Sequence, residues 1–171
     1  MELSFSFIIP VYNRPGEIRE LLKSMQKLEY NRDFEVVIVE DGSTISSEAV
    51  VQDFSGKLNI SYFKKPNSGP GDSRNFGMNR ARGNYFLILD SDVILPPQYL
   101  TEVDKELKRQ YVDSFGGPDA AHEGFSDLQK AINYAMTSFL TTGGIRGGKK
   151  MLGKFQPRSF NMGLSKKAFL A

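Results

Sequence analysis

The chain has 171 residues, a formal net charge of +2, 40% hydrophobic residues and 25% charged residues, which is typical of one soluble globular domain. It has no cysteine and one histidine, His122, so disulfides, thiolate zinc sites, cysteine nucleophiles and multi-histidine metal sites are excluded. No apolar run approaches the roughly 20 residues that span a bilayer, and the N-terminus lacks the basic region of a signal peptide, so a cytoplasmic location is expected.

The hydrophobic pattern predicts alternating strands and helices along the first 90 residues. A nearly continuous apolar run over residues 5–11 is typical of a strand covered on both faces. An amphipathic helix is predicted next over 15–28, with Asn13 as its cap and Pro15 in its first turn. Further strands are predicted over 34–39, 58–63 and 85–89, with helices over 46–54 and 70–82 and a last helix beginning near Lys166.

Strands joined by helices of this length form a mostly parallel sheet with right-handed crossovers. We therefore expect a Rossmann-like α/β fold, a single domain whose central sheet is flanked by helices. The carboxyl ends of parallel strands share one edge, which is where such sheets bind ligands. Polar clusters follow three of the predicted strands, at residues 10–14, 40–43 and 90–92, and should meet at that edge.

Asp90 and Asp92 are the most informative pair in the chain. Two carboxylates at spacing i, i+2 on an extended chain point to the same side and suit a divalent cation with its phosphate ligand. The sequence has no Gly-x-x-x-x-Gly-Lys-Ser/Thr phosphate loop, and no Gly-x-Gly-x-x-Gly follows the first strand. Phosphates at this edge would therefore be held through a hard, oxygen-preferring metal, Mg²⁺ or Mn²⁺.

Four short motifs occur in order along the first 97 residues. They are Phe-Ile-Ile-Pro-Val-Tyr-Asn-Arg at 7–14, Val-Ile-Val-Glu-Asp-Gly-Ser at 37–43, Ser-Arg-Asn-Phe-Gly at 73–77 and Leu-Asp-Ser-Asp at 89–92. Together they resemble family 2 glycosyltransferases of the GT-A fold, with a looser similarity from 116 to 163. The resemblance implies an inverting, metal-assisted transfer of sugar from a nucleotide-diphosphate sugar, in cell-surface polysaccharide biosynthesis.

The resemblance also implies roles for the matched residues. Asp41 would accept a hydrogen bond from the base, often uracil, so a donor linked to UDP is expected. Asp92 would coordinate the Mg²⁺ or Mn²⁺ ion that bridges the diphosphate. The residues expected to bind the donor are Pro10, Tyr12, Asn13, Asp41, Arg74, Asp90 and Ser91.

One departure from the family pattern concerns the catalytic base. Inverting members of the family use a carboxylate to deprotonate the acceptor hydroxyl. This carboxylate normally follows, by a few tens of residues, the stretch that corresponds to Asn161 in this chain. This chain has no acidic residue after Asp127. Either the base is one of Asp113, Asp119, His122, Glu123 and Asp127, or the chain is an N-terminal fragment with its base after Ala171, the alternative that we favour.

On this interpretation, residues 1–97 are the nucleotide-sugar-binding half of the domain and residues 98–171 are the acceptor-side half, truncated before the base. Such a chain would bind the donor but transfer sugar poorly or not at all. A non-catalytic nucleotide-sugar-binding module is the alternative function. Nucleic-acid binding is not expected, because the sequence has no aromatic stacking motif.

The C-terminal part is strongly basic. Residues 128–171 contain eight basic residues and no acidic one, whereas the first 127 contain 14 basic and 20 acidic residues. With an apolar helix predicted over 131–140 and a glycine-rich loop over 142–150, this segment fits peripheral contact with the inner face of a membrane, near a glycan or lipid-linked acceptor. A helix packed on the sheet, followed by a loop over the diphosphate, fits equally well. His122, alone in a loop, is more often ordinary polar surface than a functional residue.

Overall fold

A computed structural model describes residues 2–116 and 161–171 of the chain. The chain divides into two compact units, one formed by residues 1–115 with 159–171 and the other by residues 116–158. Several sequence predictions lie outside the described residues: the base candidates Asp119, His122, Glu123 and Asp127, the helix over 131–140 and the loop over 142–150.

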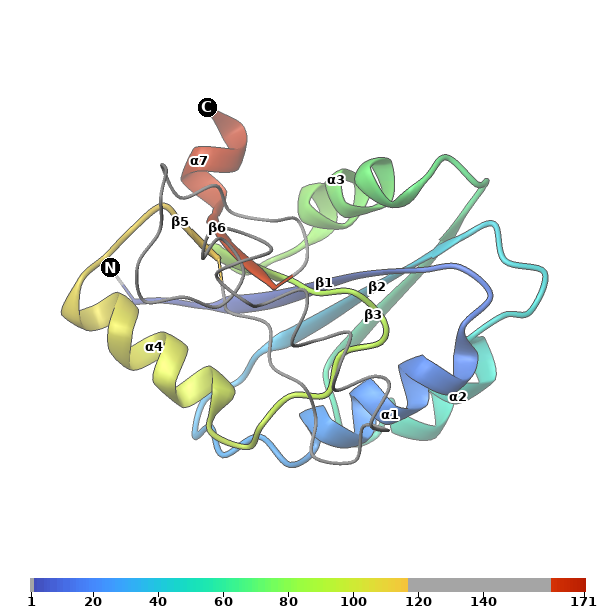
Figure 1. Ribbon diagram of the computed structural model, residues 1–171, viewed down its shortest axis with the longest axis horizontal. Helices are drawn as coiled ribbons and strands as arrows, with labels where there is room; N and C mark the ends of the chain where they lie inside the picture. Colours follow the sequence, from blue (N-terminus) through green and yellow to red (C-terminus); the bar gives the residue numbers. More distant parts are fainter. Residues whose placement is uncertain (1, 117–160) are drawn as a thin grey trace, which may run out of the picture. The chain divides into compact units, whose positions relative to one another are not determined.

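A six-stranded sheet forms the centre of the first unit (Figure 1). Its strands are β1 (Phe5–Val11), β2 (Glu35–Asp41), β3 (Ile60–Lys65), β4 (Tyr85–Ile88), β5 (Ser114–Gly116) and β6 (Met162–Ser165). They lie in the order β3-β2-β1-β4-β6-β5. β1 to β4 pair in parallel, and β6 pairs antiparallel with β4. The predicted α/β fold with a mostly parallel sheet is confirmed.

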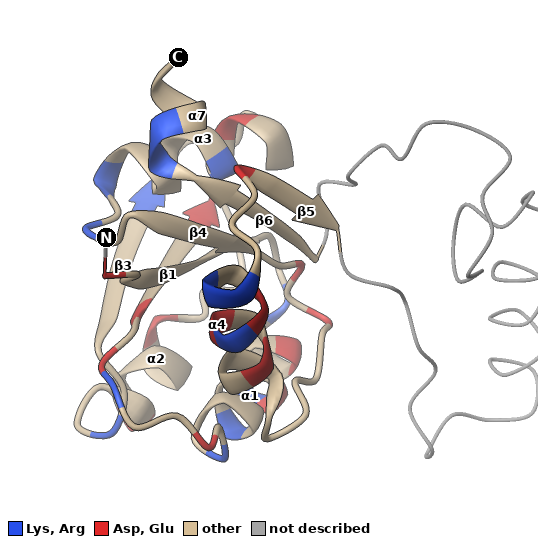
Figure 2. Ribbon diagram, turned by 90° about the vertical axis from the view of Figure 1, so that its left-hand side faces the viewer, with Lys and Arg blue, Asp and Glu red and all other residues tan. Residues whose placement is uncertain are grey.

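Helices cover both faces of this sheet (Figures 1 and 2). α1 (Pro15–Met25), α2 (Glu48–Phe54) and α4 (Tyr99–Arg109) pack on one face, and α3 (Pro70–Arg80) and α7 (Lys166–Leu170) pack on the other. None of the described helices is long and apolar enough to cross a membrane.

Side chains alternate between the two faces along each central strand, as the period of an extended chain requires. On β1, Phe7 and Ile9 join the larger core beneath α1, α2 and α4, whereas Ile8 joins the smaller core against α3. β2 follows the same alternation, with Ile38 in the larger core and Val39 in the smaller one. Both faces of these strands are therefore buried, which explains their nearly continuous apolar runs.

Within the described residues, the predicted strands and helices are confirmed within a few residues, including the helix that begins at Lys166. α4 is an additional helix that was not predicted from the sequence, although Leu100, Val103 and Leu107 recur along it at helical spacing and pack against the larger core. Its amphipathic face completes the cover of the sheet on that side.

The prediction that Asn13 caps the first helix is wrong. Arg14, with φ −131°, precedes α1, and no side chain caps the helix. Asn13 has φ 55°, a left-handed conformation that asparagine tolerates better than most residues. The turn directs its side chain to the loop after β2, where Oδ1 accepts hydrogen bonds from the N–H groups of Thr44 (2.8 Å) and Ile45 (2.9 Å).

Gly77 sets how closely α3 approaches the sheet. A Cβ at this position would lie 2.9 Å from Ile8 Cγ2 and 3.2 Å from Val39 Cγ2, both on fully buried side chains. Gly77→Ala should therefore lower the free energy of unfolding by about 1–3 kcal/mol, as overpacking of a tight core does. Urea denaturation measures the loss. Gly71→Ala, in the same helix with open space around its Cβ, is the control and should be neutral or stabilising; an equal loss in both variants would contradict the close approach.

Candidate functional site

The candidate site lies at the carboxyl edge of the sheet, where β1 separates β2 from β4. The chain passes from β1 to β2 on one side and returns to β4 on the other, so the strand order reverses here. Val11, the last residue of β1, pairs with Glu40 next to the end of β2, and Ile8 pairs with Ile88 at the end of β4, so the three strands end within a few residues of one another. A pocket of about 320 Å³ opens at this point, the position where open α/β sheets bind ligands.

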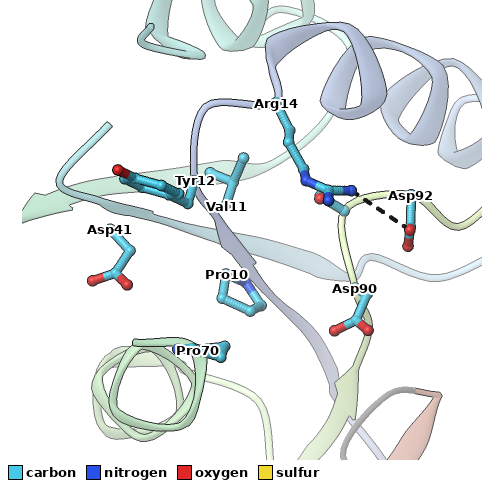
Figure 3. Close-up of a pocket in the computed structure, with 9 residues that line it drawn as sticks. Pro10, Val11, Tyr12, Arg14, Asp41, Pro70, Asp90 and Asp92 are labelled. Atoms are coloured by element: carbon cyan, nitrogen blue, oxygen red, sulfur yellow. Dashed lines mark ion pairs between the residues drawn. The ribbon is translucent and has the colours of Figure 1, made fainter. Parts of the chain in front are cut away.

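The pocket brings together most of the residues predicted for the site. Its lining residues are Pro10, Val11, Tyr12, Arg14, Asp41, Pro70, Asp90, Ser91 and Asp92 (Figure 3). Of the predicted residues, only Asn13 and Arg74 are absent from this lining. Val11 and Arg14 belong to the cluster at residues 10–14 that was predicted to lie at this edge, but they were not among the residues expected to bind the donor, and neither was Pro70, which begins a predicted helix.

Asp41 forms one end of the pocket and is almost fully buried. Its Oδ1 accepts hydrogen bonds from Lys65 Nζ (2.5 Å) and the Ser68 N–H (2.9 Å), and its Oδ2 accepts one from the Gly69 N–H (2.9 Å). Asn67 Nδ2 makes a longer contact, 3.4 Å, with Oδ2. Asp41 thereby orders the loop that leads into α3.

These hydrogen bonds keep Asp41 ionised. Burial raises the pKa of Asp41, but the hydrogen bonds from Lys65 and from the amides of Ser68 and Gly69 outweigh burial and hold its pKa below the ordinary value of 3.8. An ionised carboxylate accepts hydrogen bonds and donates none. Oδ1 accepts from two donors at 2.9 Å or less, whereas the second donor to Oδ2, Asn67 Nδ2, lies at 3.4 Å, so Oδ2 is the less fully occupied oxygen.

Asp90 and Asp92 form the other end of the pocket, with Pro10 between them and Asp41 (Figure 3). Asp90 Oδ1 accepts a hydrogen bond from Arg74 Nη2 at 2.6 Å. The Arg74 side chain is 14% exposed, and its buried Nε has no hydrogen-bond acceptor among the described residues. Arg74 therefore stands directly behind the lining, held by Asp90, with one donor unused.

Asp92 is more open. Its side chain is 59% exposed, and Arg14 Nη1 lies 3.7 Å from Oδ2. The turn that carries Asp92 is fixed to α1, because the Ser91 hydroxyl donates to Glu17 Oε2 (3.1 Å) and the Leu95 N–H donates to Ser24 Oγ (3.1 Å). A rigid turn thus presents an accessible carboxylate at the mouth of the pocket.

The residues at the Asp92 end of the pocket fit a divalent metal ion that is coordinated partly by the protein and partly by the phosphates of a bound substrate. The described residues contain no group of three or more His, Cys, Asp or Glu side chains able to enclose an ion by themselves. Mg²⁺ and Mn²⁺ accept carboxylate oxygens, and Mg²⁺ commonly binds through one or two carboxylates plus the phosphates of a substrate. Asp92, exposed and only distantly paired, supplies such a carboxylate.

Asp113, one of the alternatives for a catalytic base, lies at the opposite edge of the sheet. Its Oδ1 accepts a hydrogen bond from Ser165 Oγ at 2.6 Å, and Ser165 pairs with Tyr85 at the start of β4. Asp90 is five residues further along the chain, a length of about 16 Å in an extended strand. Asp113 is therefore not a candidate base for this pocket.

Known proteins resemble this chain in sequence. TarS of Staphylococcus aureus (strain Mu50), a poly(ribitol-phosphate) beta-N-acetylglucosaminyltransferase, is 33% identical over 114 residues, which cover 65% of this chain and 20% of that protein. GgaA of Bacillus subtilis (strain 168), a minor teichoic acid biosynthesis protein, is 28% identical over 158 residues, which cover 89% of this chain and 31% of that protein. The chain thus spans between a fifth and a third of the length of these relatives.

Solved structures resemble it in fold. S. aureus TarS 1–349 in complex with UDP-GlcNAc matches with a TM-score of 0.67 and 31% identity, over 72% of this chain and 36% of that one. Mannosyltransferase PcManGT from Pyrobaculum calidifontis, in complex with GDP-Man and Mn²⁺, matches with a TM-score of 0.64 and 24% identity, over 70% and 36% of the two chains. The second likeness shows the fold alone, and the predicted GT-A fold is confirmed.

The family predicted from the four motifs is confirmed over a longer stretch than the motifs cover. The model of glycosyl transferase family 2 matches residues 6–169. This match includes every residue that lines the pocket, together with β5, β6 and most of α7. The chain therefore belongs to glycosyl transferase family 2.

Proposed function

We propose that the chain binds the donor of a glycosyltransferase that moves a sugar from a UDP-sugar to a hydroxyl group of a cell-surface glycopolymer. One observation carries the proposal. A single pocket combines a buried carboxylate that accepts hydrogen bonds, Asp41, with an exposed carboxylate, Asp92, on either side of Pro10. The TarS complexes with UDP and UDP-GlcNAc support a uridine donor. The names of TarS and GgaA support a wall-polymer acceptor.

The nucleotide base of the donor would bind between Tyr12 and Asp41. Asp41 Oδ2, whose contact with Asn67 is long at 3.4 Å, would accept one further donor, while Oδ1 is filled by Lys65 and Ser68. Uracil presents a single ring N–H, whereas guanine presents two adjacent N–H groups that would require both oxygens. Tyr12, a lining residue that is 49% exposed, supplies an aromatic surface against which the nucleotide base can pack.

The diphosphate would lie toward Asp92. A divalent cation, when bound, neutralises charge that develops on the departing nucleoside diphosphate. Asp92 would hold that cation and Asp90 would reach the ribose. Arg74 would support donor binding by holding Asp90 in place through the hydrogen bond from its Nη2. In this arrangement Ser91 acts through the turn, which its hydrogen bond to Glu17 holds against α1.

In the proposed reaction, the acceptor oxygen forms a bond to the anomeric carbon as the bond from that carbon to the diphosphate oxygen breaks, with inversion. The acceptor proton passes to a general base, which we do not assign among the described residues. Residues 1–97 would supply the donor half of the site and residues 98–171 the acceptor side. Peripheral membrane contact would depend on residues 142–150.

Nucleotide binding tests the function directly. Ligands that bind the folded state raise its melting temperature, so UDP and dTDP, each with Mn²⁺, should raise it more than either does without metal. GDP with Mn²⁺ should give a clearly smaller shift, because Asp41 cannot accept from both guanine N–H groups. Differential scanning fluorimetry across the six conditions measures this. Absence of a shift with all three nucleotides would reject the proposal.

Asp92→Asn tests the metal end. The amide keeps the shape of the side chain but removes the charge that attracts a divalent cation. We expect the variant to lose most of the Mn²⁺-dependent gain in UDP affinity, about tenfold or more, with little change in melting temperature, as measured by titration calorimetry. Asp33→Asn, at an exposed residue before β2, is the matched control. Retained manganese dependence in Asp92→Asn would place the metal ligand elsewhere.

Asp41→Asn tests the buried acid. Because folding lowers the pKa of Asp41 below 3.8, its ionised form contributes stability above that pH, and the contribution is lost as the pH falls through 3.8 and below. Asp41→Asn should therefore be less stable than wild type at neutral pH, and the two should converge in acid. Urea denaturation at several pH values between about 6 and 3 measures this. A constant difference across that range would contradict the assignment, and Asp33→Asn should follow the wild-type curve.

A further inference from the structure

Glu40 is a buried carboxylate immediately before Asp41, and the pocket does not account for it. The residue is 3% exposed and, because side chains alternate along β2, it points to the face opposite that of Asp41. No Lys or Arg forms an ion pair with it in the part of the chain that the structure describes. A buried charge without a cation is costly unless hydrogen bonds satisfy it, so its presence at an otherwise apolar strand position needs an explanation.

Three donors converge on this carboxylate. Oε1 accepts from the Ser43 hydroxyl, and Oε2 accepts from the Ser47 N–H and the Tyr62 hydroxyl, both at 2.7 Å. Burial and the neighbouring carboxylate raise the pKa of the Tyr62 hydroxyl, so it stays protonated and donates. Glu40 thereby joins β3, the start of α2 and the loop after β2.

One of these donors continues to the pocket. Ser43 Oγ accepts the Asn13 N–H at 2.8 Å, and Asn13 Oδ1 accepts the N–H groups of Thr44 and Ile45 in return. The loops after β1 and β2 are thus tied in both directions. Asn13, held in its left-handed conformation, stands between Tyr12 and Arg14, and both of these line the pocket.

We propose that Glu40 is a positioning residue for the donor pocket, acting through Ser43 on Asn13 to fix the places of Tyr12 and Arg14. The chain of contacts runs from Glu40 Oε1 to the Ser43 hydroxyl, and from Ser43 Oγ to the Asn13 amide. The role in donor binding depends on the proposed function, whereas the ordering of the two loops does not. The Glu40 side chain forms hydrogen bonds with Ser43, Ser47 and Tyr62, none of which lines the pocket, so its effect differs from that of Asp41.

Three variants separate this role from ordinary stabilisation. Glu40→Gln keeps the side-chain shape but replaces an acceptor oxygen with a donor nitrogen, which leaves one of the three donors without a partner. Ser43→Ala breaks the link to Asn13 and leaves Glu40 with Ser47 and Tyr62. Tyr62→Phe removes a donor to the same carboxylate on β3, which contributes no residue to the pocket lining, and is the matched control.

The first measurement needs no ligand. Amide hydrogen exchange by NMR, on the nucleotide-free protein, should speed up at Asn13, Thr44 and Ile45 in Glu40→Gln and Ser43→Ala, and remain at the wild-type rate in Tyr62→Phe. Unchanged exchange at Asn13 in Ser43→Ala would overturn the proposed coupling. This result stands whether or not the wild type binds a nucleotide, so a failure of the proposed function is recognised separately, by the absence of UDP binding in wild type.

The second measurement is UDP affinity with Mn²⁺, by titration calorimetry. Glu40→Gln and Ser43→Ala should bind about tenfold more weakly than wild type, while Tyr62→Phe should stay within about twofold at a comparable loss of melting temperature. Equal weakening in all three variants would show a purely structural role and overturn the proposal. If Glu40→Gln does not fold, Ser43→Ala decides alone, and wild-type affinity in that variant would overturn it.

Discussion

The parallel pairing of β1 with β2 on one side and β4 on the other is the constraint on which the site depends. It aligns three strand ends whose residues are far apart in the chain, so that Pro10, Asp41 and Asp90 meet at one edge. The same pairing buries β1 on both faces. Each central strand must be apolar within the sheet and can carry polar side chains only where the chain leaves the sheet. The apolar runs that stabilise the sheet and the polar clusters that form the site therefore follow from the same strand pairing.

Two adjacent acids at the end of β2 show how this edge carries charge. Asp41 and Glu40 point to opposite faces, and each is surrounded by hydrogen-bond donors rather than by water. Asp41 has a buried lysine partner and orders the loop before α3. Glu40 has only neutral donors, which join the loops after β1 and β2. A buried carboxylate that lost its hydrogen-bond donors would be costly. The loops that supply these donors are therefore held in place by the two carboxylates.

The other end of the pocket is built differently. Asp92 and Arg14 are half exposed, and the distance of 3.7 Å between Arg14 Nη1 and Asp92 Oδ2 is long for an ion pair. Arg74, in contrast, is largely buried and held by Asp90. Rigid turns carry these side chains, but their polar groups are not saturated within the described residues. The Asp41 end, where most acceptor capacity is already used, would select a ligand by shape and by a single further hydrogen bond, whereas the end with Asp92 has an open carboxylate for a metal and phosphates.

The sequence by itself determined the first four strands with the helices between them, the parallel sheet and the family, because hydrophobic periodicity and short motifs are local properties of the chain. It also identified most of the pocket lining, since polar clusters at strand ends meet in any parallel sheet. Only the tertiary structure decided what Asn13 and Glu40 do, because their partners lie in other loops and depend on strand register. The sequence suggested a helix cap at Asn13; the fold instead binds its side chain to Thr44 and Ile45, about 30 residues away in the chain. Likewise, the donors that fill Asp41 Oδ1 come from the end of β3 and the following loop, and their convergence follows from the pairing of β2 with β3.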